Sequence, residues 1–287
     1  MKKVCTFKLI PLLIFCLLFT SCTGNPFGSD DIGSGTRQIR GQLQLNDNLN
    51  PKDSFVWLEA FNIGLRVDQS GEFELTLPPA ASQGGQDGVN GIFELYFFMS
   101  NYRLSKSQLV IRNGEFVFSQ GDLNGKGEFL KPVILSKSLD IATTVTPTVV
   151  AQGSSNPVDV EVRLEALLDP VWVTFPKTLG NANLLGGILI RNINSDQAFT
   201  VEAFPNIELK EEVIVVPNFP HIRTMQFTPL QKNLPVGDYE VIPYFLIKND
   251  ELPIELWASL GANLEELSSS YLSIPMAREG GQFKISN

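Results

Sequence analysis

The chain has 287 residues, enough for about two domains that each bury a core of their own. It carries 31 acidic and 22 basic side chains, for a formal net charge of −9 at pH 7. Nucleic-acid binding requires lysines and arginines gathered on one face, so this balance argues against nucleic acid as a partner. All the cysteines (Cys5, Cys16 and Cys22) precede residue 23, which excludes a disulfide within the rest of the chain, thiol catalysis there and cysteine-ligated metals.

Residues 1–21 have the pattern of a secretory signal peptide. Lys2, Lys3 and Lys8 form a basic start and precede an apolar run at 9–19. That run is shorter than the roughly 20 apolar residues that a membrane-spanning helix needs. We therefore expect export and removal of the segment rather than a transmembrane anchor.

The end of the signal peptide carries a second feature. The segment Phe19-Thr20-Ser21-Cys22 resembles the bacterial lipobox, although Phe19 replaces the commoner leucine. The resemblance implies that lipidated Cys22 becomes the first residue and holds the protein on a membrane, since acyl chains anchor durably without a basic surface. Thr23 rather than aspartate follows, which under the Gram-negative sorting rule favours the outer membrane over the inner one. An ordinary signal peptide with a coincidental cysteine is the alternative.

The first module is predicted to be a β-structure. Residues 22–36 are rich in Gly, Ser and Asp and predict a flexible linker. From 37 to 136 apolar and polar residues alternate with a period of two, which is typical of half-buried strands. Asp68-Gln69-Ser70-Gly71 separates two such runs and predicts a hairpin. The predicted strands are 37–45, 55–60, 65–67, 72–77, 92–99, 108–112, 115–119 and 128–135.

Three short motifs of this module resemble a known family. They are an opening Arg40-Gly41-Gln42-Leu43 strand, a Trp57-Leu58-Glu59-Ala60 strand, and the turn from Val67 to Phe73. Together they look like the carboxypeptidase regulatory-like domain, a transthyretin-like seven-stranded sandwich. The resemblance implies that residues 37–136 form a non-catalytic module of the kind found on many bacterial surface lipoproteins and receptors. The Gly-rich segment 82–91 departs from the family pattern and predicts a long edge loop.

Residues Asp122–Glu128 contain the most suggestive local motif for a metal. Asp122 followed two positions later by Asn124 matches the start of a calcium-binding loop. Lys126 occupies the third ligand position, where a cation repels calcium and supplies no oxygen. A tight turn through Asn124-Gly125 is the favoured interpretation, and calcium binding is the alternative.

The second module is also predicted to be all-β. A Gln-Gly-Ser-Ser-Asn-Pro cluster near residue 155 places a linker at 137–157, although its Thr/Val part is compatible with a strand. Short strands with Pro, Gly and Asn between them then predict an immunoglobulin-like sandwich over 158–287. The fold class is thus two consecutive β-sandwich domains, transthyretin-like and then immunoglobulin-like. Leucines at helical spacing in 252–267 predict one short helix that covers an end of the second sandwich, although Pro253 and Gly261 weaken it.

Nothing in the sequence favours catalysis. The single histidine, His221, follows Asn218-Phe219-Pro220 and is expected in a surface loop. One histidine cannot build a three-ligand zinc site without several carboxylates, and no Gly-x-Ser-x-Gly nucleophile motif occurs. We therefore expect no enzyme, no catalytic or metal-binding residues and no cofactor, with Cys22 as the one modified residue. A hydrolase with paired carboxylates is the least favoured alternative.

Aromatic residues separate the two remaining functional hypotheses. Trp57 and Trp172 lie in strongly apolar strands and are expected in the cores. The first hypothesis is a lipid-anchored envelope protein that acts as a structural or protein-interaction module. The alternative is an extracellular module that binds a glycan or other ligand, and it predicts exposed aromatic rings.

Overall fold

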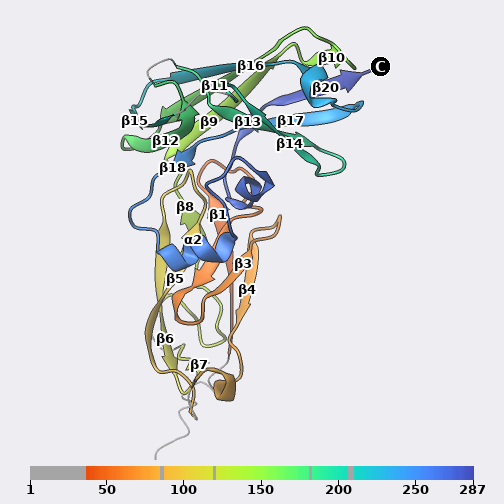
Figure 1. Ribbon diagram of the computed structural model, residues 1–287. Helices are drawn as coiled ribbons and strands as arrows, with labels where there is room; N and C mark the ends of the chain where they lie inside the picture. The colour runs from red at the N-terminus through yellow and green to blue at the C-terminus, as the bar shows by residue number, and fades with distance from the viewer. Residues whose placement is uncertain (1–36, 85–86, 119–120, 181–182, 206–209) are drawn as a thin grey trace, which may run out of the picture.

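The computed structural model describes residues 37–287, apart from 85–86, 119–120, 181–182 and 206–209. The fold is all-β, as predicted, and its two modules stand end to end (Figure 1). The expected signal peptide, the lipidation residue Cys22 and the linker lie outside the described residues. Within the part of the chain that is described, no helix has the length and apolar character needed to cross a bilayer.

Module one is a sandwich of two sheets. One sheet has the order β4-β1-β8 and the other has the order β3-β2-β5-β6-β7. Their inward side chains, among them Ile39, Leu43, Phe97 and Leu109, form one core. The strands are β1 (Gln38–Leu45), β2 (Phe55–Leu58), β3 (Ile63–Arg66), β4 (Glu72–Thr76), β5 (Gly91–Phe98), β6 (Ser105–Arg112), β7 (Glu115–Phe116) and β8 (Val133–Leu135).

The turn at Asp68–Gly71 forms as predicted, but the hairpin does not. The Asp68 carboxylate accepts the backbone N–H groups of Ser70 and Glu72, each at 2.9 Å, and Gly71 has a φ of 84°. The strands on either side then pair in different sheets, β3 with β2 and β4 with β1. Turn chemistry reverses the chain locally, but it does not decide which sheet each strand joins.

Module two places three sheets around one core. Their orders are β10-β20-β17-β13-β14, β16-β11-β9-β19 and β15-β12-β18. The strands are β9 (Leu139–Thr146), β10 (Val149–Ala151), β11 (Val158–Ala166), β12 (Val171–Thr178), β13 (Gly187–Asn192), β14 (Ala198–Glu202), β15 (Lys210–Val216), β16 (His221–Phe227), β17 (Gly237–Pro243), β18 (Leu246–Ile247), β19 (Glu279–Gly280) and β20 (Gln282–Ser286).

The linker expected at 137–157 is largely part of module two. β9 lies between β11 and β19, and its Leu139, Ile141 and Val145 belong to the core. β10 pairs with β20 in parallel register. Alternating Ile, Thr and Val residues suit a strand that is buried on one face, and that preference outweighs the neighbouring turn residues.

The predicted helix exists, but its packing differs from the prediction. α2 (Ile254–Leu260) follows Pro253 and ends at Gly261. It lies at the junction of the two modules rather than on the second sandwich alone. Its Leu256 and Leu260 belong to an apolar cluster that also contains Leu189 and Ile242 of module two and Trp57 and Tyr96 of module one, whose side chains project from the outer face of the β2–β5 sheet.

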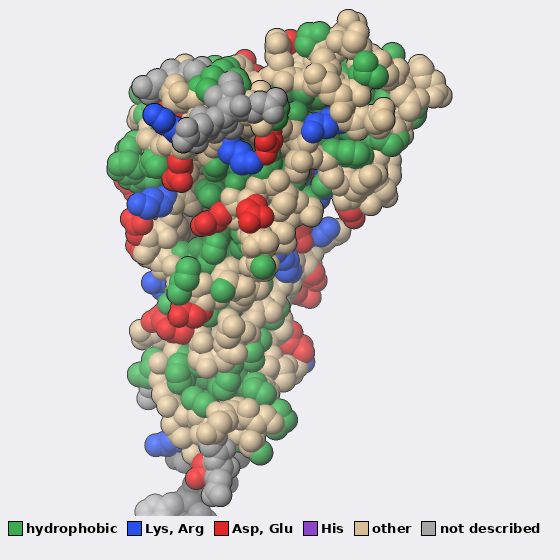
Figure 2. Space-filling model, in the orientation of Figure 1, with side chains coloured by type: hydrophobic (Ala, Val, Ile, Leu, Met, Phe, Trp, Pro, Cys, Tyr) green, Lys and Arg blue, Asp and Glu red, His purple; other side chains and the backbone are tan. Residues whose placement is uncertain are grey.

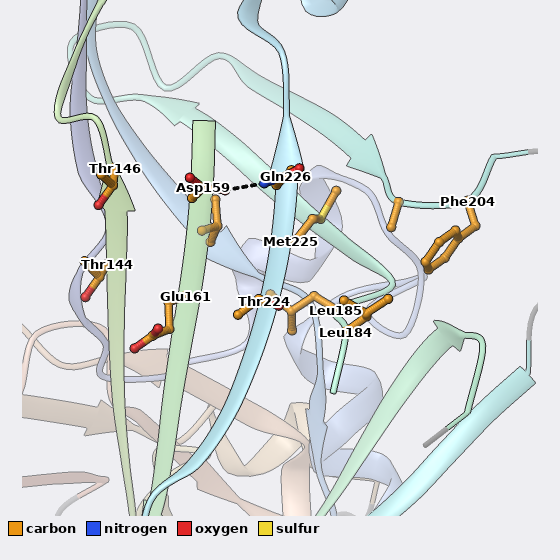
Figure 3. A pocket seen from close by; sticks show the side chains of 12 residues that line it. Thr144, Thr146, Asp159, Glu161, Leu184, Leu185, Phe204, Thr224, Met225 and Gln226 are labelled. Atoms are coloured by element: carbon orange, nitrogen blue, oxygen red, sulfur yellow. Dashed lines mark hydrogen bonds between the residues drawn. The ribbon is translucent and has the colours of Figure 1, made fainter. Parts of the chain in front are cut away.

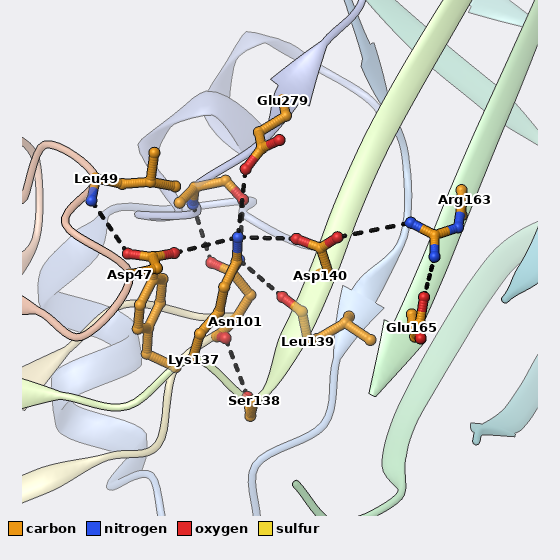
Figure 4. Close-up of polar contacts among 12 residues, drawn as sticks. Asp47, Leu49, Asn101, Lys137, Ser138, Leu139, Asp140, Arg163, Glu165 and Glu279 are labelled. Carbon is orange, nitrogen blue, oxygen red and sulfur yellow. Dashed lines mark hydrogen bonds and ion pairs between the residues drawn. The ribbon is translucent and has the colours of Figure 1, made fainter. Parts of the chain in front are cut away.

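A polar cluster reinforces this junction between the modules (Figure 4). The Lys137 ammonium lies 2.8 Å from Asp140, 3.2 Å from Asp47 and 3.5 Å from Glu279, with only 6% of the side chain exposed. The Asn101 amide donates to the carbonyls of Leu139 (3.1 Å) and Ala277 (2.9 Å), and its oxygen accepts the Ala277 N–H. These contacts fix module two against module one.

The chain enters module one at the end remote from module two. β1 starts there, paired with the end of β4, and runs toward the junction, where the following Asp47 meets Lys137 (Figure 1). Any tether that precedes residue 37 is therefore attached at the end of the molecule opposite module two.

Candidate interaction surface

Trp172 is exposed, contrary to the prediction that it lies in the core. It is the second residue of β12, and 53% of its surface is accessible. Its neighbours Val173 and Phe175 supply the inward side chains of that strand. The apolar run at 171–175 concealed this alternation, because both faces of the strand carry apolar residues. Trp57 is buried as predicted, and its indole N–H donates to Asn62 at 2.8 Å.

Two valines of β15 extend the surface around Trp172. Trp172 is directly opposite Val215, and Thr174 is directly opposite Val213, so all four side chains project from the same face of the sheet. Val213 is 48% exposed and Val215 is 42% exposed. We call Trp172, Val213 and Val215 the Trp172 face. Figure 2 shows hydrophobic side chains on the side of module two where β12 and β15 lie.

A groove of about 450 Å³ runs beside this face, between the modules. Trp172, Lys248 and Asn249 line it from module two, and Arg103 lines it from module one. An ion pair between Arg103 and Asp169 crosses it. An aromatic ring next to hydrogen-bonding side chains is the chemistry that binds the apolar face and the hydroxyls of a sugar.

Another groove, of about 800 Å³, lies on the outer face of β9, β11 and β16 (Figure 3). Leu184 and Phe204 form its apolar wall. Its ionisable groups are Asp159 and Glu161, which share the outward face of β11, and Asp159 accepts a hydrogen bond from Gln226. Both carboxylates are exposed to solvent.

We expected His221 in a surface loop. It is instead the first residue of β16 and is half-buried. Its Nε2 accepts the Nε–H of Arg223 at 3.0 Å. Burial lowers the pKa of the imidazole, and the Arg223 cation lowers it further. Arg223 is itself buried, pairs with Glu212 at 2.8 Å and lies 4.4 Å from the ring centre of Phe175. The arrangement makes His221 a neutral acceptor within a packing cluster.

The Asp122–Glu128 loop forms the turn that was the favoured interpretation. The side-chain oxygen of Asn124 accepts the backbone N–H groups of Lys126 (2.8 Å) and Glu128 (3.0 Å). The Asn124 amide donates to the Glu128 carboxylate, and Asp122 accepts the hydroxyl of Ser107. These bonds close the loop through Asn124. Residues 37–287, where described, hold no cluster of three or more metal-ligating side chains.

Comparison with known proteins yields no functional assignment. No family model matches the chain, and no curated protein matches it in sequence. Among solved structures, the major pilin subunit BcpA of Bacillus cereus is similar at 9% identity and a TM-score of 0.27, over 73% of this chain and 68% of that one. The Bacillus anthracis TIE protein is similar at 9% identity and a TM-score of 0.24, over 75% of this chain and 48% of that one. Likenesses this weak carry no argument.

Proposed function

We propose that this chain is a lipid-anchored, non-catalytic protein of the bacterial cell envelope that binds another envelope protein through the Trp172 face. The observation that carries the proposal is an exposed tryptophan beside two exposed valines on one face of the β12–β15 pair. Contiguous apolar surface of this kind is costly to leave in water and marks interaction sites. Trp is also enriched among residues that dominate binding energy.

The position of this face agrees with a membrane tether. Because the chain enters module one at the end remote from module two, a lipid on Cys22 would place module two away from the membrane. Module one, with its resemblance to the carboxypeptidase regulatory-like domain, would then serve as a spacer. The rigid junction would hold the Trp172 face at a fixed orientation, and the residue after Cys22 favours the outer membrane.

The test is a crosslinking pull-down from intact cells that carry the full chain. We expect a specific protein to be recovered with the wild-type chain and to be reduced about tenfold by Trp172→Thr, since an aromatic anchor contributes on the order of 2 kcal/mol or more. Ile92→Thr is the matched control, because Ile92 is 66% exposed but lies on β5 of module one. Equal recovery with both variants would refute the role of the Trp172 face.

Metabolic labelling of the same cells tests the anchor. Cys22→Ser should remain unprocessed and take up no labelled palmitate. Normal lipidation of that variant would show that the lipobox interpretation is wrong.

A second candidate function is glycan binding, which the groove beside Trp172 favours. Recovery of polysaccharide rather than protein in the pull-down, lost in Trp172→Thr, would establish it instead.

A further inference from the structure

β15 is an edge strand with an unpaired side. It pairs with β12, and none of the other described strands pairs with it. It spans seven residues and contains no proline or bulge-forming glycine. Such an edge is a template for another strand unless charge, proline or a covering segment blocks it.

The direction of the backbone groups of β15 follows from a single hydrogen bond. The Trp172 carbonyl accepts the Lys248 N–H at 2.9 Å, so the peptide groups of Trp172 point toward β18. Backbone groups alternate along a strand, so those of Val173 point toward β15 and meet Ile214, which is opposite. The N–H and C=O groups of Val213 and Val215 therefore point outward from the sheet.

Two other edge strands, β16 and β4, differ from β15. Thr224 of β16 donates to Asn183 at 3.0 Å and its carbonyl accepts the Leu185 N–H at 2.9 Å, so a loop covers that edge. β4 exposes the carboxylates Glu72 and Glu74. β15 also exposes charged side chains, Lys210 and Glu211, but only at its start. Its Val213 and Val215 are exposed, and within the described residues their outward backbone groups meet no other strand, which is the combination that strand addition requires.

We infer that β15 pairs antiparallel with β15 of a second copy of this chain, about a two-fold axis at Val213. In this register Val213 is opposite Val213 of the second copy, and Glu211 is opposite its Val215. The outward-pointing backbone groups of both strands then face one another, so the edge is self-complementary. The inference goes beyond the proposed function, because it assigns a second copy of this chain, rather than another envelope protein, to the edge beside the Trp172 face.

Charge and packing favour a second copy in this register. The two Glu211 carboxylates lie at opposite ends of the paired strands, so no like charges are directly opposite each other. The Trp172 faces of the two chains join into one apolar strip across the axis. Salt at physiological ionic strength screens the repulsion between exposed charges of the two chains that lie more than about 8 Å apart.

The inference is tested by disulfide trapping in the full chain. Residues directly opposite in a hydrogen-bonded antiparallel pair have Cα atoms about 5.5 Å apart, within the range that a disulfide spans. Under mild oxidation, Val213→Cys should yield about tenfold more covalent dimer than Ile92→Cys, an exposed site outside β15. The wild-type chain is the control for crosslinks that form through Cys5, Cys16 or Cys22. Co-expressed Val215→Cys and Glu211→Cys chains should crosslink to each other, whereas Val215→Cys alone should not.

The outcomes separate this inference from the proposed function. If Val213→Cys yields no more covalent dimer than Ile92→Cys, and both variants melt at the wild-type temperature, pairing with a second copy is overturned. If a Trp172-dependent partner is nonetheless recovered from cells, the proposed function stands and another protein occupies the face. If Val213→Cys crosslinks but no Trp172-dependent envelope partner is recovered, self-pairing is the sole use of the face.

Discussion

One lysine at the module junction carries its charge on an almost fully buried side chain. Lys137 is surrounded by Asp47, Asp140 and Glu279. Burial alone would lower the pKa of the ammonium, but its hydrogen bonds to Asp140 and Asp47 outweigh burial and raise that pKa above its ordinary value. Lys137 therefore stays charged at neutral pH, and its contribution to stability is lost only when the pH rises through this elevated pKa.

Replacement of Lys137 by methionine should destabilise the protein by about 3–5 kcal/mol, because it leaves carboxylates together without their buried cation. Urea unfolding measures the loss. Lys248→Met is the matched control, since Lys248 and Asp250 form an exposed pair at 3.6 Å, and it should change stability by no more than about 0.5 kcal/mol. A similar small effect at Lys137 would contradict the structural role of the cluster.

At the scale of elements, α2 depends on module one for its stability. It has seven residues, too few for an isolated helix to persist in water. Leu256 is buried in the junction cluster, whereas Ile254 of the same helix is exposed. The energy that holds α2 in place therefore comes from packing in the junction cluster, which includes the β2–β5 sheet, rather than from helix propensity.

Leu256→Ala should cost about 2–5 kcal/mol of unfolding free energy, because it leaves a cavity between the modules. Ile254→Ala on the same helix should cost less than about 0.5 kcal/mol. Denaturant unfolding followed by tryptophan fluorescence would report the difference, since Trp57 lies in the same cluster. Equal effects of the two substitutions would show that α2 does not dock as described.

At the scale of the whole molecule, the modules should unfold together. The junction combines an apolar cluster with the bonds of Asn101 and Lys137, and chain segments from both modules contribute to each. Calorimetry should show one transition with a ratio of calorimetric to van't Hoff enthalpy near one. Asn101→Ala removes bonds across the junction and should raise that ratio. Two resolved transitions in the wild-type protein would contradict a rigid junction.

Periodicity predicted the strands well, but not their partners. The alternation in β1, β4 and β11 was readable, because one face of each is buried and the other is wet. The turn at Asp68–Gly71 was also predictable from its residues. The pairing of β3 and β4 in different sheets was not, since it depends on strands that lie far away in the sequence.

The sequence by itself determined the all-β class, the burial of Trp57 and the turn at Asn124, because alternation and turn chemistry are local properties. Only the tertiary structure decided that 139–151 belongs to module two, that α2 packs on module one, and that Trp172 is exposed. It also decided that β15 is an edge strand. An apolar side chain in a strand is buried or exposed according to what covers its face, and that covering comes from residues remote in the chain.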